Sequence, residues 1–161
     1  MEKLKFAVAG CGFWSKLQIG AWSELEGAEL VAVYNRTISK AQKIAETFKV
    51  PRVYDNPEDL FKREKLDFVD IITDVETHAH FVEMAVRYGI KHIICQKPMA
   101  SDFETAKQMV KICSEAGAKL YIHENYRWQA PVRRFKEILD SGVIGKPFKA
   151  RVTFLSGFPV F

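Results

Sequence analysis

The sequence has few of the features that mark disulfide-rich or membrane-spanning proteins. It contains only three cysteines in 161 residues, Cys11, Cys95 and Cys113. Because they are odd in number and widely spaced, they indicate reduced thiols in a cytosolic protein rather than a disulfide framework or a zinc site. No run approaches the ~18 apolar residues of a membrane-spanning helix, and the first residues lack a signal-peptide pattern. We therefore expect a cytoplasmic protein without membrane contact.

The chain also lacks a concentration of charge of one sign. The formal net charge is +4 and the basic residues are scattered, whereas a nucleic-acid-binding protein more often concentrates them on one face or tail. The densest group, Arg127, Arg133, Arg134 and Lys136, is best interpreted as a mostly solvated helix face. We therefore expect no nucleic-acid partner. Hydrophobic residues make up 48% and charged residues 27%, which is typical of a globular domain.

Strand-like and helix-like segments alternate along the chain. The predicted strands are residues 4–9, 30–34, 53–54, 68–72, 92–95 and 119–122. The predicted helices are residues 14–26, 38–48, a short helix capped by Asn56, 77–88, a helix capped by Ser101 with Glu104 completing a capping box, and about 131–140. The strands are mostly continuous apolar runs, as expected for strands covered on both faces. The pattern predicts an α/β fold of Rossmann type, a doubly wound parallel sheet with helices on both sides.

The last stretch has a different pattern. Apolar and polar residues alternate from Phe148 to Phe154, which predicts a half-buried strand. One such strand cannot cover its own apolar face. We therefore expect residues 1–122 to form the Rossmann domain. Residues 123–161 would be a connecting helix and the first strand of a second, α+β domain that is truncated here.

A glycine-rich turn follows the first predicted strand. In the segment Gly10–Ser15 the first glycine permits a tight turn, and Gly12 lets a pyrophosphate approach the backbone. Ser15 is small enough for the following helix to pack closely against the strand. The start of that helix offers free N–H groups to phosphates. We predict that Gly10, Gly12, Phe13 and Trp14 bind a dinucleotide; the alternative is a glycine turn without a ligand.

The end of the second predicted strand lacks the carboxylate that commonly binds an adenosine ribose. It reads Tyr34-Asn35-Arg36-Thr37. Asn35 can bond a ribose hydroxyl, and Arg36 beside Thr37 can hold a 2′-phosphate or lie against the adenine. Alternatively, Asn35 is a turn residue, Thr37 a helix cap, and Arg36 is in solvent. The segment favours NADP over NAD.

Five short segments, in their order and spacing, resemble the Gfo/Idh/MocA oxidoreductases. They are Gly10–Trp14, Thr73–His78, Cys95–Pro98, Asn125–Arg127 and Gly142–Pro147, and the likeness covers essentially the whole chain. The resemblance implies an NAD(P)-dependent dehydrogenase that transfers a hydride at a hydroxyl or carbonyl carbon of a small, sugar-like or polyol-like substrate. It also implies a second domain that covers the nicotinamide, through which we expect a homo-oligomer. This chain would be the cofactor-binding domain, able to bind NAD(P) but inactive alone.

The resemblance assigns roles to the loop after the fourth predicted strand. Members of the family usually have Thr-Pro-Asn and then a histidine; Thr73 and His78 match, but Asp74 and Val75 replace the Pro-Asn pair. Thr73, Asp74 and His78 would then contact the ribose and nicotinamide side of the cofactor. Alternatively, Thr73, Asp74 and Thr77 only cap the next helix, with His78 in its first turn.

The resemblance also implies that Lys97 is the catalytic residue. The family's Glu-Lys-Pro is Gln96-Lys97-Pro98 here, and a lysine at the carboxyl end of a parallel strand lies where ligands bind. Lys97 would reach the nicotinamide ribose and the substrate hydroxyl, with Gln96 and Pro98 also at the cofactor. Pro98 can follow a cis peptide bond. Gln96 keeps the shape of glutamate without its charge. A surface lysine with no role is the alternative.

The segment after the sixth predicted strand completes the expected site. By resemblance, Asn125 lies near the nicotinamide, and Tyr126 and Arg127 near the substrate; alternatively, Tyr126 and Trp128 pack against the second domain. No metal is expected, because His78 and His80 point in different directions from a helix. The alternative function is a non-catalytic NAD(P)-binding or sugar-binding sensor on the same fold, since fold does not fix chemistry.

Overall fold

The structure, a computed structural model, describes residues 2–153 and 155. The strands are β1 (Leu4–Ala9), β2 (Ala28–Tyr34), β3 (Arg52–Tyr54), β4 (Phe68–Ile71), β5 (His92–Gln96) and β6 (Lys119–His123). The helices are α1 (Phe13–Ser23), α2 (Ile38–Phe48), α3 (Pro57–Arg63), α4 (Val75–Arg87), α5 (Phe103–Glu115), the 3-10 helix η1 (Asn125–Trp128) and α6 (Ala130–Asp140). The chain forms two compact units, Met1–His123 and Glu124–Phe161, which are described separately.

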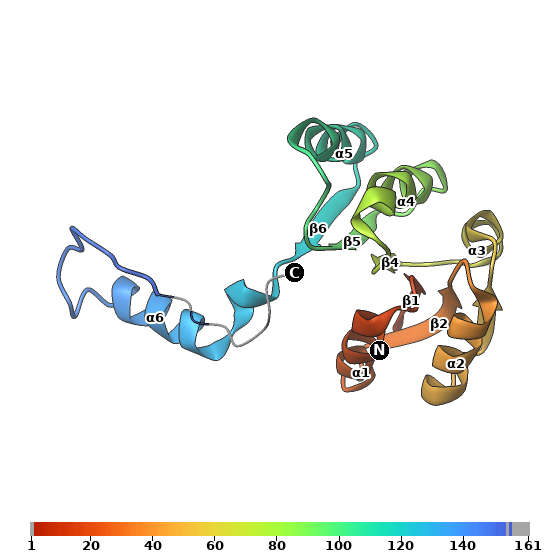
Figure 1. Cartoon of the computed structure of the whole chain (residues 1–161), viewed down its shortest axis with the longest axis horizontal. Coiled ribbons are helices and arrows are strands. Elements are labelled where there is room, and N and C mark those ends of the chain that lie inside the picture. Colours follow the sequence, from red (N-terminus) through yellow and green to blue (C-terminus); the bar gives the residue numbers. More distant parts are fainter. Residues whose placement is uncertain (1, 154, 156–161) are drawn as a thin grey trace. The chain divides into compact units, whose positions relative to one another are not determined.

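The first unit is built on one parallel sheet. Its strand order is β3-β2-β1-β4-β5-β6 (Figure 1), and all neighbouring strands run parallel. The chain proceeds outward from β1 to β3 and then returns to β4 beside β1. The order therefore reverses between β1 and β4, where the carboxyl edge of a doubly wound sheet binds ligands. The predicted Rossmann fold is confirmed.

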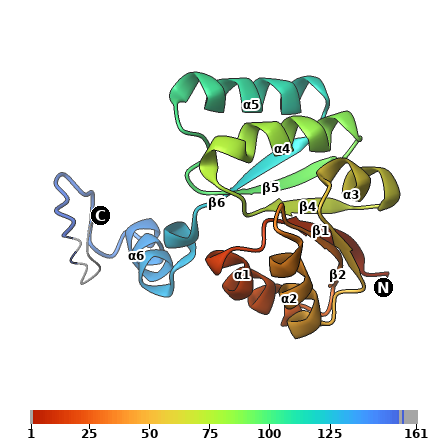
Figure 2. The same cartoon turned by 45° about the vertical axis from the view of Figure 1, so that its right-hand side comes forward.

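Helices cover both faces of this sheet, as Figure 2 shows. On β1, Phe6 and Val8 face the cluster that packs under α1 and α2, whereas Ala7 and Ala9 face the cluster under α3, α4 and α5. All four are at most 1% exposed. A strand buried on both faces needs apolar residues at successive positions, which accounts for the continuous apolar runs in the sequence.

Two predictions about helix ends need correction. Helix α1 ends at Ser23 rather than near residue 26, because Glu24 and Leu25 donate to Ala21 and Trp22 in turns. Ser101 is not the cap of α5. The cap is Asp102, whose carboxylate accepts from the Thr105 backbone N–H at 2.8 Å, and a carboxylate also interacts favourably with the positive end of the helix.

The expected cap of α3 is confirmed. The Asn56 side chain accepts from the Glu58 backbone N–H at 2.9 Å, and Pro57 occupies the first helical position, where its missing N–H is not needed.

The second unit contains η1 and α6. The predicted strand at its end is wrong for the residues that are described: positions 148–153 have no regular structure, and Phe154 lies outside the described residues. A strand needs hydrogen bonds to a neighbouring strand, and the described part of the chain supplies none here. The units divide after His123, one residue beyond the predicted boundary. That the second unit begins an α+β domain stays a prediction.

Candidate functional site

The turn after β1 admits only glycine at its first position. Gly10 has φ +106°, and a Cβ there would lie 2.5 Å from the carbonyl oxygen of Ile72. This contact arises because the ends of β1 and β4 are neighbours. The Gly10 N–H donates to the Tyr34 carbonyl at 2.8 Å. The turn is therefore held from both sides by adjoining strands.

The second glycine leaves open space. Gly12 caps α1, and a Cβ there would meet no atom within 4 Å. Behind it, Ser15 is fully buried and its hydroxyl donates to the Gly12 carbonyl at 2.6 Å, in the close helix–strand contact predicted for that position. The first amides of a helix have no partner within the helix. Open space beside such amides suits an anionic group.

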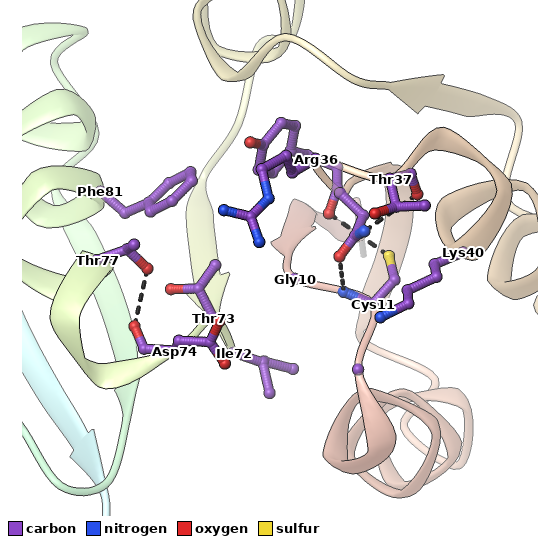
Figure 3. A pocket seen from close by; sticks show the side chains of 13 residues that line it. Gly10, Cys11, Arg36, Thr37, Lys40, Ile72, Thr73, Asp74, Thr77 and Phe81 are labelled. Carbon is purple, nitrogen blue, oxygen red and sulfur yellow. Dashed lines mark hydrogen bonds between the residues drawn. The ribbon is translucent and has the colours of Figure 1, made fainter.

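A cleft opens at this turn, and Figure 3 shows its lining. Three loops at the carboxyl edge of the sheet form it, which follow β1, β2 and β4. Of the predicted site residues, it brings together Gly10, Gly12, Asn35, Arg36, Thr37, Thr73 and Asp74. It also contains Lys40, Thr77 and Phe81, none of which was predicted as a cofactor contact. Lys40 lies three residues after Thr37, so the first turn of α2 carried a signal for it. Phe81 follows the apolar spacing of the core face of α4, so the sequence carried no signal that it lines a cleft.

The Asn35 side chain stabilises the glycine turn through two hydrogen bonds. Its Oδ1 accepts from the Cys11 N–H at 3.0 Å, and its Nδ2 donates to the Thr37 carbonyl at 3.0 Å. These bonds match the turn-residue interpretation, so a ribose contact by Asn35 would have to use the second lone pair of Oδ1 or the second N–H of Nδ2. Thr37 begins α2, but its side chain makes no capping hydrogen bond.

The cleft is lined by cationic side chains on the β2 side. Figure 3 shows the Arg36 guanidinium extending into it, between Phe81 and the Gly10 turn, and Lys40 reaching toward Cys11. Lys16, Lys40 and Lys43 also line an adjoining hollow beside Gly12. Several positive charges around open backbone amides form an environment that attracts phosphate groups.

The β4 side contributes an unpaired hydroxyl. Thr73 Oγ1 is buried and has no hydrogen-bond partner among the described residues, a costly arrangement unless a ligand completes it. Asp74 begins α4 without a side-chain cap bond, and its carbonyl instead accepts from Thr77 Oγ1 at 2.8 Å. The orphaned hydroxyl, the open glycine and the cationic lining together fit a bound dinucleotide.

His78 lies in the interior rather than in the cleft lining. Its ring is 1% exposed. Nε2 is 3.0 Å from the Thr73 carbonyl, and Nδ1 is 3.1 Å from the Pro98 carbonyl and 3.3 Å from that of Met99. The side chain therefore links the loop after β4 to the loop after β5. Direct cofactor contact by His78 stays a prediction, and the structure gives it a positioning role.

The loop after β5 brings Lys97 to the same edge as the glycine turn. The Lys97–Pro98 peptide bond is cis, as expected. The Lys97 ammonium lies 5.8 Å from the ring centroid of Trp14, at the start of α1. Gln96 Oε1 accepts from the Lys97 N–H at 2.7 Å. Phe13 and Trp14 are 77% and 49% exposed, so both rings are open to a ligand.

Three predicted site residues belong to the second unit. Asn125, Tyr126 and Arg127 lie in η1, where the Arg127 guanidinium carbon is 5.7 Å from the Trp128 ring centroid. Their part in binding cofactor or substrate stays a prediction.

Two further properties concern the part of the chain that the structure describes. It holds no group of three or more His, Cys, Asp or Glu side chains arranged to bind a metal ion. None of its helices is long and apolar enough to cross a membrane.

Comparisons with known proteins agree with this geometry. The chain is 42% identical over all 161 residues to D-apiose dehydrogenase of Rhizobium rhizogenes, covering 46% of that protein. It is 31% identical over 148 residues to the NADP(+) D-xylose 1-dehydrogenase of Haloarcula marismortui, covering 89% of this chain and 41% of that protein. The chain is also similar to a crystal structure of an oxidoreductase from Agrobacterium radiobacter in complex with NAD+, L-tartaric acid and magnesium. The TM-score is 0.88 and the sequence identity 40%, over 91% of this chain and 42% of that one.

The chain thus spans less than half the length of these relatives. Residues 4–124 match the family described as "Oxidoreductase family, NAD-binding Rossmann fold", which includes the glycine turn, the cleft and the Lys97 loop. The chain belongs to the Gfo/Idh/MocA oxidoreductase family, and these residues are its NAD-binding Rossmann domain.

Proposed function

We propose that this chain is the cofactor-binding part of an NAD(P)-dependent dehydrogenase that transfers a hydride at a hydroxyl-bearing or carbonyl carbon of a sugar or polyol. The observation that carries the proposal is the open glycine turn beside the cationic cleft, with Lys97 at the same edge. The substrate class rests on the relatives, whose names are those of sugar dehydrogenases.

The lining of the cleft supports NADP over NAD. The loop after β2 and the first turn of α2 carry Arg36, Thr37 and Lys40 and no carboxylate. A guanidinium, an ammonium and a hydroxyl can together bind a 2′-phosphate, whereas a ribose 2′-hydroxyl is commonly bound by an acidic side chain. Phe81 lines the same cleft as an apolar wall, with 4% of its surface exposed.

Lys97 is the residue that we propose to act in the chemical step. It would bond the nicotinamide ribose and the substrate hydroxyl, orient that hydroxyl, and assist the movement of its proton. The cofactor supplies the hydride chemistry. The Trp14 ring near the Lys97 ammonium supports this position, because a cation and an aromatic face attract each other and limit where the ammonium can lie.

The test is a titration of the purified chain with NADPH and NADH, followed by nicotinamide fluorescence. We expect saturable binding below about 1 mM, which is ordinary for a cofactor, and tighter binding of NADPH. Arg36→Ala should weaken NADPH binding about tenfold with little effect on NADH, because it removes a charge-assisted contact to the 2′-phosphate alone.

Arg63→Ala is the matched control, since Arg63 ends α3 away from the cleft lining. Absence of saturable binding to either cofactor would refute the proposal. Equal effects of Arg36→Ala on NADPH and NADH would refute the NADP preference and leave dinucleotide binding intact.

A further inference from the structure

A chain of hydrogen bonds connects a buried carboxylate to the backbone of Lys97. Asp70 on β4 is fully buried. Its Oδ2 accepts from Trp22 Nε1 at 2.8 Å, and both of its oxygens accept from Gln18 Nε2, at 2.8 and 2.7 Å. Gln18 Oε1 accepts from Gln96 Nε2 at 3.2 Å, and Gln96 Oε1 accepts from the Lys97 N–H at 2.7 Å. The chain crosses from β4 through α1 to β5.

The two ends of this chain fix its direction. A backbone N–H can only donate and an ionised carboxylate can only accept. Gln96 must therefore turn its oxygen to Lys97 and its nitrogen to Gln18. Gln18 must in turn direct its oxygen to Gln96 and its nitrogen to Asp70. Neither amide can flip without placing two acceptors or two donors against each other.

We propose that Asp70 and Gln18 act through Gln96 as positioning residues for Lys97. The need to donate a hydrogen bond to Gln18 is then the reason why position 96 holds glutamine instead of glutamate. The inference rests on the proposed function only in assigning Lys97 to the cofactor. An ionised glutamate at position 96 could accept from the Lys97 N–H but could not donate to Gln18.

The charges around Asp70 strengthen this requirement. Burial raises the pKa of Asp70, and the hydrogen bonds from Trp22 and Gln18 and the nearby His123 oppose the rise. Burial raises the pKa of Cys95, and the charge of Asp70 adds to the rise. Gln96 lies on the same face of the sheet as Asp70, on the adjoining strand. A second carboxylate at position 96 would add like charge to a buried network in which Asp70 has no ion pair with any described Lys or Arg side chain.

The first variant that tests the proposal is Gln96→Glu. At pH 8 it should lower the midpoint of thermal unfolding by about 5 °C, because a buried acceptor on Gln18 loses its donor. NADPH binding should weaken about fivefold. Lowering the pH should reduce the thermal deficit relative to the parent protein, since a protonated carboxyl at position 96 would again donate to Gln18.

The decisive variant is the double substitution Asp70→Asn with Gln96→Glu. An amide at position 70 can accept from Trp22 and donate to Gln18, which then turns and donates to the carboxylate at position 96. Every group in the chain is then satisfied, with only the two hydrogen bonds of Gln18 reversed in direction. The double variant should unfold within about 2 °C of Asp70→Asn alone, and its NADPH affinity should return with it.

Two control variants distinguish the direction of the hydrogen bonds from loss of the chain and from the change of charge. Gln96→Ala removes the chain, so Asp70→Asn should not rescue it. Gln108→Glu makes the same charge change at an exposed site on α5, and should change neither quantity. A Gln96→Glu variant as stable as the parent at pH 8, or a double variant with no rescue, would overturn the proposal.

Recovery of thermal stability without recovery of NADPH affinity would refute the positioning of Lys97. The thermal measurements need no cofactor, so they remain decisive for the hydrogen-bond chain even if the parent protein binds neither NADH nor NADPH and the proposed function fails.

Discussion

Two regions meet at the cofactor edge of this sheet, and they are held in place by different means. The phosphate turn, Gly10–Ser15, is shaped mainly by backbone geometry: a positive φ, close contact with Ile72 and a carbonyl partner on β2, with one side-chain bond from the Cys11 N–H to Asn35. The lysine loop, Gln96–Met99, is held by side chains, since Gln96 binds its first amide and His78 its later carbonyls. The turn therefore tolerates no added side chain at Gly10, whereas the lysine loop depends on partners far away in the sequence.

The most severe way to break the phosphate turn is Gly10→Ala. The added Cβ would lie 2.5 Å from the Ile72 oxygen, and φ +106° is unfavourable for any L side chain. Strain and overlap together should lower the free energy of unfolding by about 4 kcal/mol, measured by urea denaturation. Gly20→Ala is the control, because a Cβ there meets no atom within 4 Å and alanine favours helix. A parent-like stability for Gly10→Ala would show that the turn is not held by its backbone.

The corresponding change in the lysine loop is His78→Ala. It removes a buried ring and leaves the carbonyls of Thr73, Pro98 and Met99 without that partner. We expect a loss of about 3 kcal/mol in the free energy of unfolding. His80→Ala on the exposed side of the same helix should stay within about 0.5 kcal/mol. Equal losses for the two variants would remove His78 from the scaffold of the loop.

The same difference explains what could be predicted from the sequence. The glycine turn and the Rossmann fold were predictable, because glycine spacing and apolar periodicity act locally. The interior position of His78 and the hydrogen-bond chain from Asp70 were not, because they join residues 20 to 78 positions apart. A partial signal was present: a lone carboxylate inside the apolar strand Phe68–Ile71 requires polar partners when buried. Nothing in the sequence indicated that Gln18 and Trp22 would supply them.

Gly12→Ser separates binding from folding within the phosphate turn. The side chain would enter open space, and serine is a favourable helix cap, so stability should not fall. The same side chain would occupy the path of the pyrophosphate, and the affinity for NADH and NADPH should fall about thirtyfold, or about 2 kcal/mol. Nicotinamide fluorescence measures the affinity and thermal unfolding the stability. Unchanged affinity would contradict binding at this turn.

Cys11 in the phosphate turn and Cys95, directly before the lysine loop, are both buried, and their reactivity gives the test with the smallest expected effect. Burial raises the pKa of both Cys11 and Cys95 to about 12, so at pH 8 both should react slowly with a disulfide reagent until the protein unfolds. Cys11 is 6% exposed and lines the open cleft, whereas Cys95 is fully buried beneath the lysine loop. Small openings of the turn should therefore make Cys11 react about tenfold faster, a difference of about 1.4 kcal/mol. Saturating NADPH should cover the cleft and abolish the difference in rate. The Cys11→Ser and Cys95→Ser variants identify which kinetic phase of the reaction belongs to which thiol. Equal rates without NADPH would mean that the turn and the loop open together, and that the contrast between backbone-held and side-chain-held regions does not extend to their dynamics.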